Sequence, residues 1–179
     1  MQKIPINNGR KIRIIHKTMA VEGGYVDNPN IIDQPTNSGI TQPTLDKYNA
    51  DHPEFNFPDN VKNLTSEQAR QIYGEYYEER RIGDIKNERI ATAIFDMGVM
   101  SNFNNVGKIV QETLNDSMDT NLKIDGKIGD KTIDALNNIP GDRVDDFMQD
   151  LKENRIKYLR GLFGWGKYGC GWTNRTNRY

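Results

Sequence analysis

The segment 87–100 is the feature of this sequence that most constrains the fold. Its apolar residues follow a helical period yet cover much of the circumference of a helix: Ile90, Ala91, Ile94, Phe95 and Met97. Such a helix needs protein on most of its sides, so we expect it at the centre of a hydrophobic core. With 179 residues, the chain can surround it with one domain, or with one compact domain and a smaller packed module.

Five further segments show the apolar period of amphipathic helices. They span about residues 9–21, 64–81, 106–115, 130–138 and 142–163. The second of them begins with a capping box, in which Thr65 caps the helix and Gln68 bonds back, with Leu64 placed to pack on Ala69. The sequence therefore predicts a mainly α fold.

Two segments lack this period. Residues 27–58 are rich in Asn, Pro, Asp and Thr, and we interpret them as one long ordered loop with room for a short pair of strands. Loops of this length in compact domains are usually functional. Residues 164–179 hold too many glycines for a helix and too many aromatic residues for a plain linker, so we expect them to be irregular and packed back onto the body.

Composition excludes several classes of protein. No apolar run approaches the roughly 20 residues of a membrane span, and the basic N-terminus lacks the apolar core of a conventional signal peptide. Cys170 is the only cysteine, which excludes an internal disulfide and a cysteine zinc site, and the two histidines do not suggest a metal cluster. Residues 125–129 lack the alternating ligands of a calcium loop and are interpreted as a structural turn. We expect no metal and no cofactor.

Glu22 is the first candidate for chemistry. It lies seven residues after Ile15, so the helical period places it near the inward face of the first helix, at the end where the helix dipole disfavours an anion. Desolvation and the dipole are both expected to raise the pKa of this carboxyl, as a general acid requires. Gly23 and Gly24 follow, and they allow backbone and substrate to approach closely. On position alone, however, a surface glutamate at a frayed helix end is the more ordinary interpretation.

The sequence after Glu22 favours the chemical interpretation. Glu-Gly-Gly-Tyr-Val at 22–26, and Thr-Asn at 36–37 followed by Gly-Ile-Thr at 39–41, resemble in order and spacing two blocks of glycoside hydrolase family 108. These are the muramidases also described as secretion-activator proteins, and they include phage endolysins. Residues 94–99 are similar to the family's core helix with its buried Asp. Two later segments, 110–132 and 171–175, are similar to its peptidoglycan-binding module.

This resemblance implies a lysozyme-like helical fold and a specific reaction. The enzyme would hydrolyse the β-1,4 bond between N-acetylmuramic acid and N-acetylglucosamine, with Glu22 as the general acid. A second group must stabilise the transition state or position water, and Asp33 and Thr36 are the candidates. The residues expected to contact substrate are Gly23, Gly24, Tyr25, Tyr48, Asp96 and Trp172. The division implied is a catalytic domain at 1–105 and a peptidoglycan-binding helical region at 106–179.

Two departures from the family pattern bear on the second catalytic group. The family has Asp-Pro-Gly-Gly where this chain has Ile-Ile-Asp-Gln at 31–34, so Ile31 occupies the usual acid position and Asp33 lies nearby. The family also has Val-Asn-Ser-Gly where residues 99–102 are Val-Met-Ser-Asn. Neither departure changes Glu22. The identity of its partner, and with it inversion or retention at the sugar, stays open.

The expected partner is the glycan strand of peptidoglycan, without nucleic acid or stable membrane insertion. Residues 155–179 hold six basic side chains and no acidic one, which favours a polyanion such as a wall polymer or a stem-peptide carboxylate, or is simply a solvated tail. No helix presents a continuous basic face, so nucleic acid has little support. We expect synthesis in the cytoplasm and action in the periplasm or cell wall, by a route that the sequence does not specify.

Two other functions stay open at this stage. A lytic transglycosylase also uses one glutamate, but it forms a 1,6-anhydro product without water. A non-catalytic wall-binding or secretion-assembly protein is suggested by Ile31 and by the basic, aromatic C-terminal end. The oligomeric state is unspecified.

Overall fold

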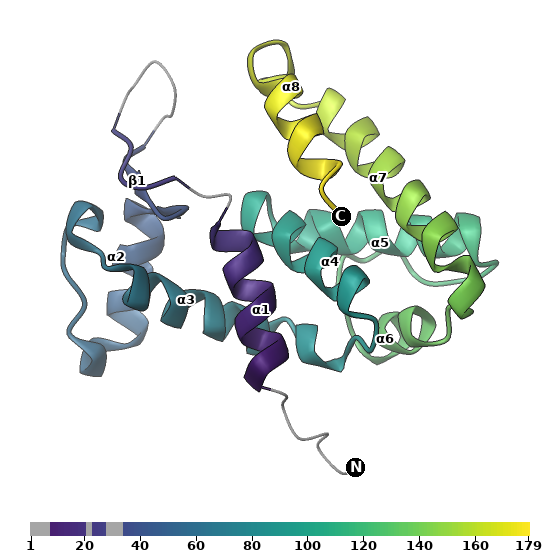
Figure 1. Ribbon diagram of the computed structural model, residues 1–179, viewed down its shortest axis with the longest axis horizontal. Coiled ribbons are helices and arrows are strands. Elements are labelled where there is room, and N and C mark those ends of the chain that lie inside the picture. Colours follow the sequence, from purple (N-terminus) through teal and green to yellow (C-terminus); the bar gives the residue numbers. More distant parts are fainter. Residues whose placement is uncertain (1–7, 21–22, 28–33) are drawn as a thin grey trace. The chain divides into compact units, whose positions relative to one another are not determined.

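Helices account for most of the chain (Figure 1), which confirms the predicted mainly α class. This computed structural model describes residues 8–20, 23–27 and 34–179. The sheet of the described residues is one antiparallel pair, β1 (Thr36–Asn37) and β2 (Ile40–Thr41). The chain forms two compact units, Met1–Glu79 and Arg80–Tyr179. The predicted functional division at residue 105 is a separate matter and stays a prediction.

In the first unit, helix α1 (Asn8–Met19) packs against helix α3 (Ser66–Glu79). Ile14, Ile15 and Thr18 of α1 are buried as the period predicts, whereas Ile12 on the same predicted stripe is 54% exposed. Lys11 adds a polar contact between the two helices, because its Nζ atom lies 2.7 Å from a carboxylate oxygen of Glu78. The amphipathic helix predicted at the N-terminal end is therefore confirmed.

The start of α3 has the capping box expected from the sequence. The backbone N–H of Thr65 donates to the side-chain oxygen of Gln68 at 3.0 Å, and the N–H of Gln68 donates to the Thr65 hydroxyl at 3.2 Å. Leu64, just before this cap, and Ala69, just after it, are both buried. The cap therefore sets the first residue of the helix locally.

Helix α2 (Gln42–Asp51) corrects the prediction of one long loop over residues 27–58. Thr41 caps this helix, and a proline lies in its first turn, where proline is well tolerated. Only two of its side chains, those of Leu45 and Tyr48, are buried. Two buried positions do not make a repeating apolar stripe. The helix therefore has the residues that begin a helix but lacks the apolar period from which a helix is predicted. The expected short pair of strands is present in the same segment.

The core of the second unit is helix α4 (Glu88–Met100), in which every residue from Ile90 to Gly98 is buried. This confirms the central helix predicted from its apolar circumference. The helices around it are α5 (Phe103–Ser117), α6 (Asp130–Asn137), α7 (Val144–Arg160) and α8 (Trp165–Thr176). Helix α5 packs against both α4 and α7, and α7 packs against α8, the yellow-green pair in Figure 1.

Helix α8 overturns the prediction that residues 164–179 are irregular, although they do pack back, on α7. One of its glycines, Gly169, makes room for an aromatic ring. A Cβ atom on Gly169 would come within 2.7 Å of the Trp165 ring. The rings of Tyr168 and Trp172 lie 5.8 Å apart. Partial burial of these large rings and their contacts with one another oppose the low helix propensity of glycine, which costs about 1 kcal/mol per residue.

The loop before α6 is held by Gln111, a buried side chain of α5. Its amide nitrogen donates to a carboxylate oxygen of Asp125 and to the carbonyl of Lys127, both at 3.0 Å. Its amide oxygen accepts from the backbone N–H of Gly126 at 2.8 Å. Gly126 has a φ of +78°, a backbone conformation that favours glycine. The segment 125–129 is therefore the structural turn expected from the sequence.

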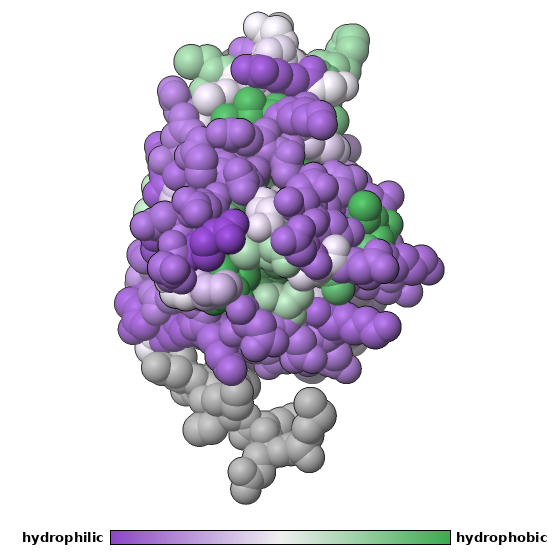
Figure 2. Space-filling view, turned by 90° about the vertical axis from the view of Figure 1, so that its right-hand side faces the viewer, coloured by the Kyte–Doolittle hydropathy of each residue, from purple (hydrophilic) through white to green (hydrophobic). Residues whose placement is uncertain are grey.

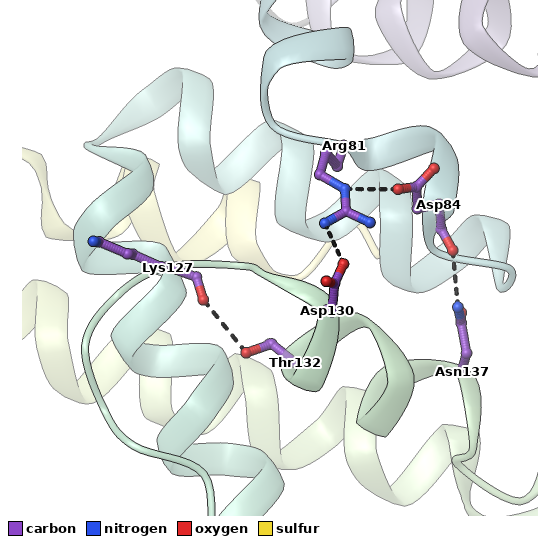
Figure 3. A network of polar contacts seen from close by, with 6 residues as sticks. All are labelled: Arg81, Asp84, Lys127, Asp130, Thr132 and Asn137. Atoms are coloured by element: carbon purple, nitrogen blue, oxygen red, sulfur yellow. Dashed lines mark hydrogen bonds and ion pairs between the residues drawn. The ribbon is translucent and has the colours of Figure 1, made fainter. Parts of the chain in front are cut away.

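A second polar network joins this loop and α6 to the segment before α4 (Figure 3). The guanidinium of Arg81 lies 2.7 Å from Asp84 and 2.6 Å from Asp130. The side chain of Asn137 donates to the backbone carbonyl of Asp84 at 2.8 Å. Side chains thus fix the position of the short helix α6.

The surface of the molecule is mainly polar. The face drawn in Figure 2 is largely hydrophilic with small apolar patches, in line with a mean hydropathy of −0.80. Among the described residues, no helix is both long and apolar enough to cross a membrane.

We predict that Gln111→Leu lowers the free energy of unfolding by roughly 3 kcal/mol, because it leaves the buried N–H of Gly126 without its acceptor at similar side-chain volume. Chemical denaturation monitored by circular dichroism measures the change. Gln149→Leu is the matched control, since Gln149 is exposed on α7, and it should change stability by at most about 0.5 kcal/mol. Equal losses in the two variants would show that the Gln111 contacts do not hold the loop.

Candidate functional site

The strand pair brings together two of the sequence blocks singled out above. Val26 and Thr36 form an antiparallel bridge in which each backbone N–H donates to the other residue's carbonyl, at 2.8 and 2.9 Å. Thr36 in turn pairs with Thr41 on β2. The segment that begins Gly23-Gly24 therefore runs beside the Thr36 hairpin.

The hairpin has one buried and one partly open face. Asn37 and Ile40 are paired across the strands and are both buried. Side chains alternate along a strand, so Thr36 and Thr41 belong to the other face, and both are half-buried. The turn between the strands has positive φ at Ser38 (52°) and Gly39 (77°), as a two-residue hairpin turn requires. The turn geometry thus selects which face carries Thr36.

Asn37 is the residue that fixes this hairpin. Its Nδ2 atom lies within hydrogen-bond distance of three backbone carbonyls, those of Val61 at 3.0 Å, Lys62 at 3.2 Å and Leu64 at 3.0 Å. These carbonyls belong to or follow a short 3-10 helix, Val61–Asn63. One buried amide therefore ties the hairpin to a segment more than twenty residues away in sequence.

Two further side chains complete the attachment. The hydroxyl of Tyr73, on α3, donates to the carbonyl of Ser38 at 2.8 Å. The side chain of Gln42, the first residue of α2, donates to the carbonyl of Asp59 at 2.7 Å and accepts from the N–H of Val61 at 2.8 Å. The hairpin is thus anchored at its turn, on its buried face and at the helix that follows it.

Gly23, Gly24 and Tyr25 are exposed beside this hairpin. Within the described residues, nothing lies within 4 Å of a Cβ built on either glycine, so neither is required there for close packing. The Tyr25 hydroxyl donates to Asp27 at 3.0 Å, and the Lys62 ammonium lies 5.6 Å from the centre of its ring. Partial desolvation and the contact with Asp27 raise the pKa of Tyr25.

Tyr48 lies in an aromatic cluster of the same unit, with Phe57 and His52 at ring-centre distances of 5.0 and 4.6 Å. Its ring is only 7% exposed, and its hydroxyl donates to Glu75 at 2.8 Å. Burial, together with this carboxylate, raises the pKa of Tyr48. The exposed member of the cluster is Phe55, at 41%. Sequence reasoning singled out Tyr48 and missed the residues around it; the substrate contact of Tyr48 stays a prediction.

Glu22, Ile31 and Asp33 lie outside the residues that the structure describes. The roles assigned to Glu22 and Asp33 therefore stay predictions. Of the three catalytic candidates, Thr36 is the one whose surroundings are described, and its side chain belongs to the partly open face of the hairpin.

Asp96 and Trp172 belong to the second unit. Asp96, on α4, is 4% exposed, and its two carboxylate oxygens accept from the Arg175 guanidinium at 3.1 and 2.7 Å. This confirms the buried Asp expected on the core helix, here as half of a buried ion pair; contact of Asp96 with substrate stays a prediction. Trp172, also on α8, lines a pocket of the same unit together with Arg155. Sequence reasoning did not indicate Arg155 as a pocket residue, because its burial depends on how α7 and α8 pack.

Among the described residues, no group of three or more His, Cys, Asp and Glu side chains is arranged to hold a metal ion. The chemistry available in this part of the chain is that of hydroxyl, amide, carboxylate and guanidinium groups.

Comparison with known proteins identifies the relatives of the chain. The sequence pattern of the family Glycosyl hydrolase 108 matches residues 15–101. Among solved structures, the chain is similar to SagA of Brucella abortus, with 30% sequence identity, coverage of 95% of this chain and 91% of that chain, and a TM-score of 0.77. Comparison with curated proteins gives no match. These findings confirm the resemblance seen in the sequence and the lysozyme-like helical fold that it implied.

The three carbonyls around the Asn37 side chain lead to a prediction in which protein stability depends on pH. Asn37→Asp replaces a donor by a carboxylate that faces three carbonyls, and it should lower the free energy of unfolding by roughly 3 kcal/mol at neutral pH. The three carbonyls should raise the pKa of the new carboxyl in the folded protein above its value near 3.9 in the unfolded chain. Stability should therefore fall as the pH rises from the unfolded-state pKa to the folded-state pKa, and it should recover on acidification. Thermal unfolding across this pH range measures the effect.

Asn63→Asp provides the matched control, because Asn63 is an exposed residue of the adjoining 3-10 helix. It should show neither the loss nor the pH dependence. A stable Asn37→Asp protein whose unfolding has the same pH profile as the control would contradict the role given to Asn37.

Proposed function

We propose, from the premise that this chain belongs to the Glycosyl hydrolase 108 family, that it is a muramidase with Glu22 as its general acid. The bond cleaved would be the β-1,4 bond between N-acetylmuramic acid and N-acetylglucosamine in peptidoglycan. The observation that carries the proposal is the extent of the family match, residues 15–101, which includes Glu22, the two glycines and the Thr36 hairpin. The proposed place of action is the periplasm or cell wall, with glycan strands as the partner.

The geometry of the hairpin supports this assignment. The bridge between Val26 and Thr36 aligns the segment that follows Glu22 with the partly open face of the hairpin. In the proposed reaction, Glu22 gives its proton to the glycosidic oxygen while the bond from that oxygen to the sugar carbon breaks. Water supplies the new bond to that carbon and loses a proton to a carboxylate or to solvent. Thr36 would orient this water, and Asp33 is the nearby carboxylate in sequence.

The open surroundings of Gly23 and Gly24 also support a substrate at this place. Glycine is common where backbone must pass close to another group or adopt a positive φ. Neither glycine has a packing neighbour among the described residues. No contact with the described residues calls for the two glycines of the family motif, and a bound glycan strand would supply the close approach.

The decisive experiment compares wild type with Glu22→Gln on purified sacculi, with mass spectrometry of the released muropeptides. Hydrolysis predicts products that carry an added water, and Glu22→Gln should reduce their release by about 100-fold or more, because an amide cannot donate the proton. Glu67→Gln, an exposed glutamate at the start of α3, should retain activity. Products of 1,6-anhydro mass would instead identify a lytic transglycosylase. Binding to sacculi without release of muropeptides would identify a non-catalytic wall protein.

A second variant tests whether substrate occupies the space beside the glycines. Gly24→Ala should change the free energy of unfolding by at most about 1 kcal/mol, since the added methyl meets none of the described residues. It should nevertheless slow muropeptide release by about tenfold or more, because displacement of the substrate by as little as 1 Å is costly. Gly141→Ala, equally open and outside the motif, is the control. Full activity in Gly24→Ala would remove the argument for substrate at this position.

A further inference from the structure

A pocket of about 150 Å³ lies within the second unit, between the end of α4, the start of α5, α7 and α8. Its apolar wall is formed mainly by Leu159, Leu162 and Trp172, and its polar wall includes Asn105, Arg155 and Tyr158. All of these residues are described and belong to one compact unit. The pocket is therefore defined without reference to the Glu22 motif.

Arg155 gives the pocket its charge. Its side chain is 2% exposed, and its Nε donates to the hydroxyl of Thr176 at 3.0 Å. Among the described residues no carboxylate forms an ion pair with Arg155, because Asp96 nearby binds Arg175 with both oxygens. Burial is the main cause that lowers the pKa of Arg155. Of the two buried guanidinium groups, only that of Arg175 is paired with the carboxylate of Asp96.

A buried cation without a paired anion is costly, and an anionic ligand would offset that cost. The guanidinium fork matches a carboxylate in geometry as well as in charge. Tyr158 adds a donor, since its hydroxyl accepts from Asn105 at 2.8 Å and keeps its own hydrogen for another acceptor. The polar wall is therefore suited to two oxygen atoms of an anion.

The size of the pocket selects among carboxylate ligands. A cavity of about 150 Å³ holds a molecule the size of benzene. A disaccharide does not fit, whereas a carboxylate with a few attached carbons does. The wall formed by Leu159, Leu162 and Trp172 suits a small aliphatic group beside the carboxylate. The ligand is thus the end of a chain and not its middle.

We propose that this pocket binds a free carboxylate at the end of a peptidoglycan stem peptide, with Arg155 and Tyr158 as its polar partners and Trp172 against its aliphatic part. The proposal rests on the proposed function for the identity of the polymer, but not for the chemistry of the pocket. It gives the second unit a ligand that differs from the glycan bond cleaved at the first.

Fluorescence of Trp172 reports on the pocket directly. The chain has two tryptophans, so Trp165→Phe leaves Trp172 as the sole emitter. Titration with a soluble stem tetrapeptide is expected to change its emission to saturation. The same peptide with every carboxyl group amidated should bind about tenfold more weakly or not at all, since charged hydrogen bonds are lost. Equal binding of the two peptides, or no binding of either, would overturn the proposal.

Variants then assign the binding to Arg155. Arg155→Met in the Trp165→Phe background should lose the preference for the free carboxylate while keeping a similar side-chain length. Lys157→Gln removes one positive charge from the exposed face of the same helix and should bind as the parent does. If Arg155→Met does not fold, as judged by circular dichroism, Tyr158→Phe decides: it should weaken binding of the free peptide by several fold and leave the amidated peptide unchanged. An unchanged affinity would refute the assignment.

Two further experiments identify the source of the carboxylate and test the pocket proposal separately from the proposed function. Sacculi stripped of stem peptides by an amidase retain lactyl carboxylates on the glycan, so binding that survives stripping would identify the glycan as the source and reject the stem peptide. Glu22→Gln in the Trp165→Phe background should bind the free tetrapeptide as its parent does, because the proposed contacts are made by Arg155, Tyr158 and Trp172. Hydrolysis by a protein that does not bind the peptide would refute the pocket proposal alone. Peptide binding by a protein that does not hydrolyse sacculi would refute the proposed enzyme function alone.

Discussion

The buried ion pair between Asp96 and Arg175 is the interaction on which the second unit depends. Asp96 lies in the most apolar helix of the chain, where an unpaired carboxylate would cost several kcal/mol. Both of its oxygens accept from Arg175 of α8, which packs on α7. The pair therefore joins α8 to the core helix α4. Trp172, three residues earlier on that helix, is placed at the pocket as a result.

This same pairing explains why Arg155 is unusual. A second buried guanidinium remains on α7 once Arg175 has taken both oxygens of Asp96. Thr176 satisfies one of its five N–H donors but none of its charge. Natural cores seldom keep such a group for stability alone, because an apolar side chain of equal size would serve packing better. A role in binding gives the cost of burying Arg155 a physical reason.

The sequence predicted most of the helices, because their apolar residues repeat with the helical period over several turns. Helices α2 and α8 were not predicted, for two different reasons. Helix α2 buries only two side chains, and Gly169 of α8 is explained only by the Trp165 ring that lies against it. In the candidate site, the family resemblance indicated Thr36, and the two glycines followed the Glu22 candidate in sequence. It did not indicate Asn37 as the anchor, since its three carbonyl partners lie 24–27 residues further along the chain.

The candidate site separates what holds the hairpin from what acts on substrate. A two-stranded hairpin of this length is not stable alone in water, so it depends on the side chains that anchor it. The bonds made by Asn37, Gln42 and Tyr73 all join residues between 37 and 73. The substitution of the family's usual acid by Ile31 lies outside that set. In the proposed reaction, loss of this acid would bear on how the transition state is stabilised, whereas the described bonds that anchor the hairpin come from residues 37–73.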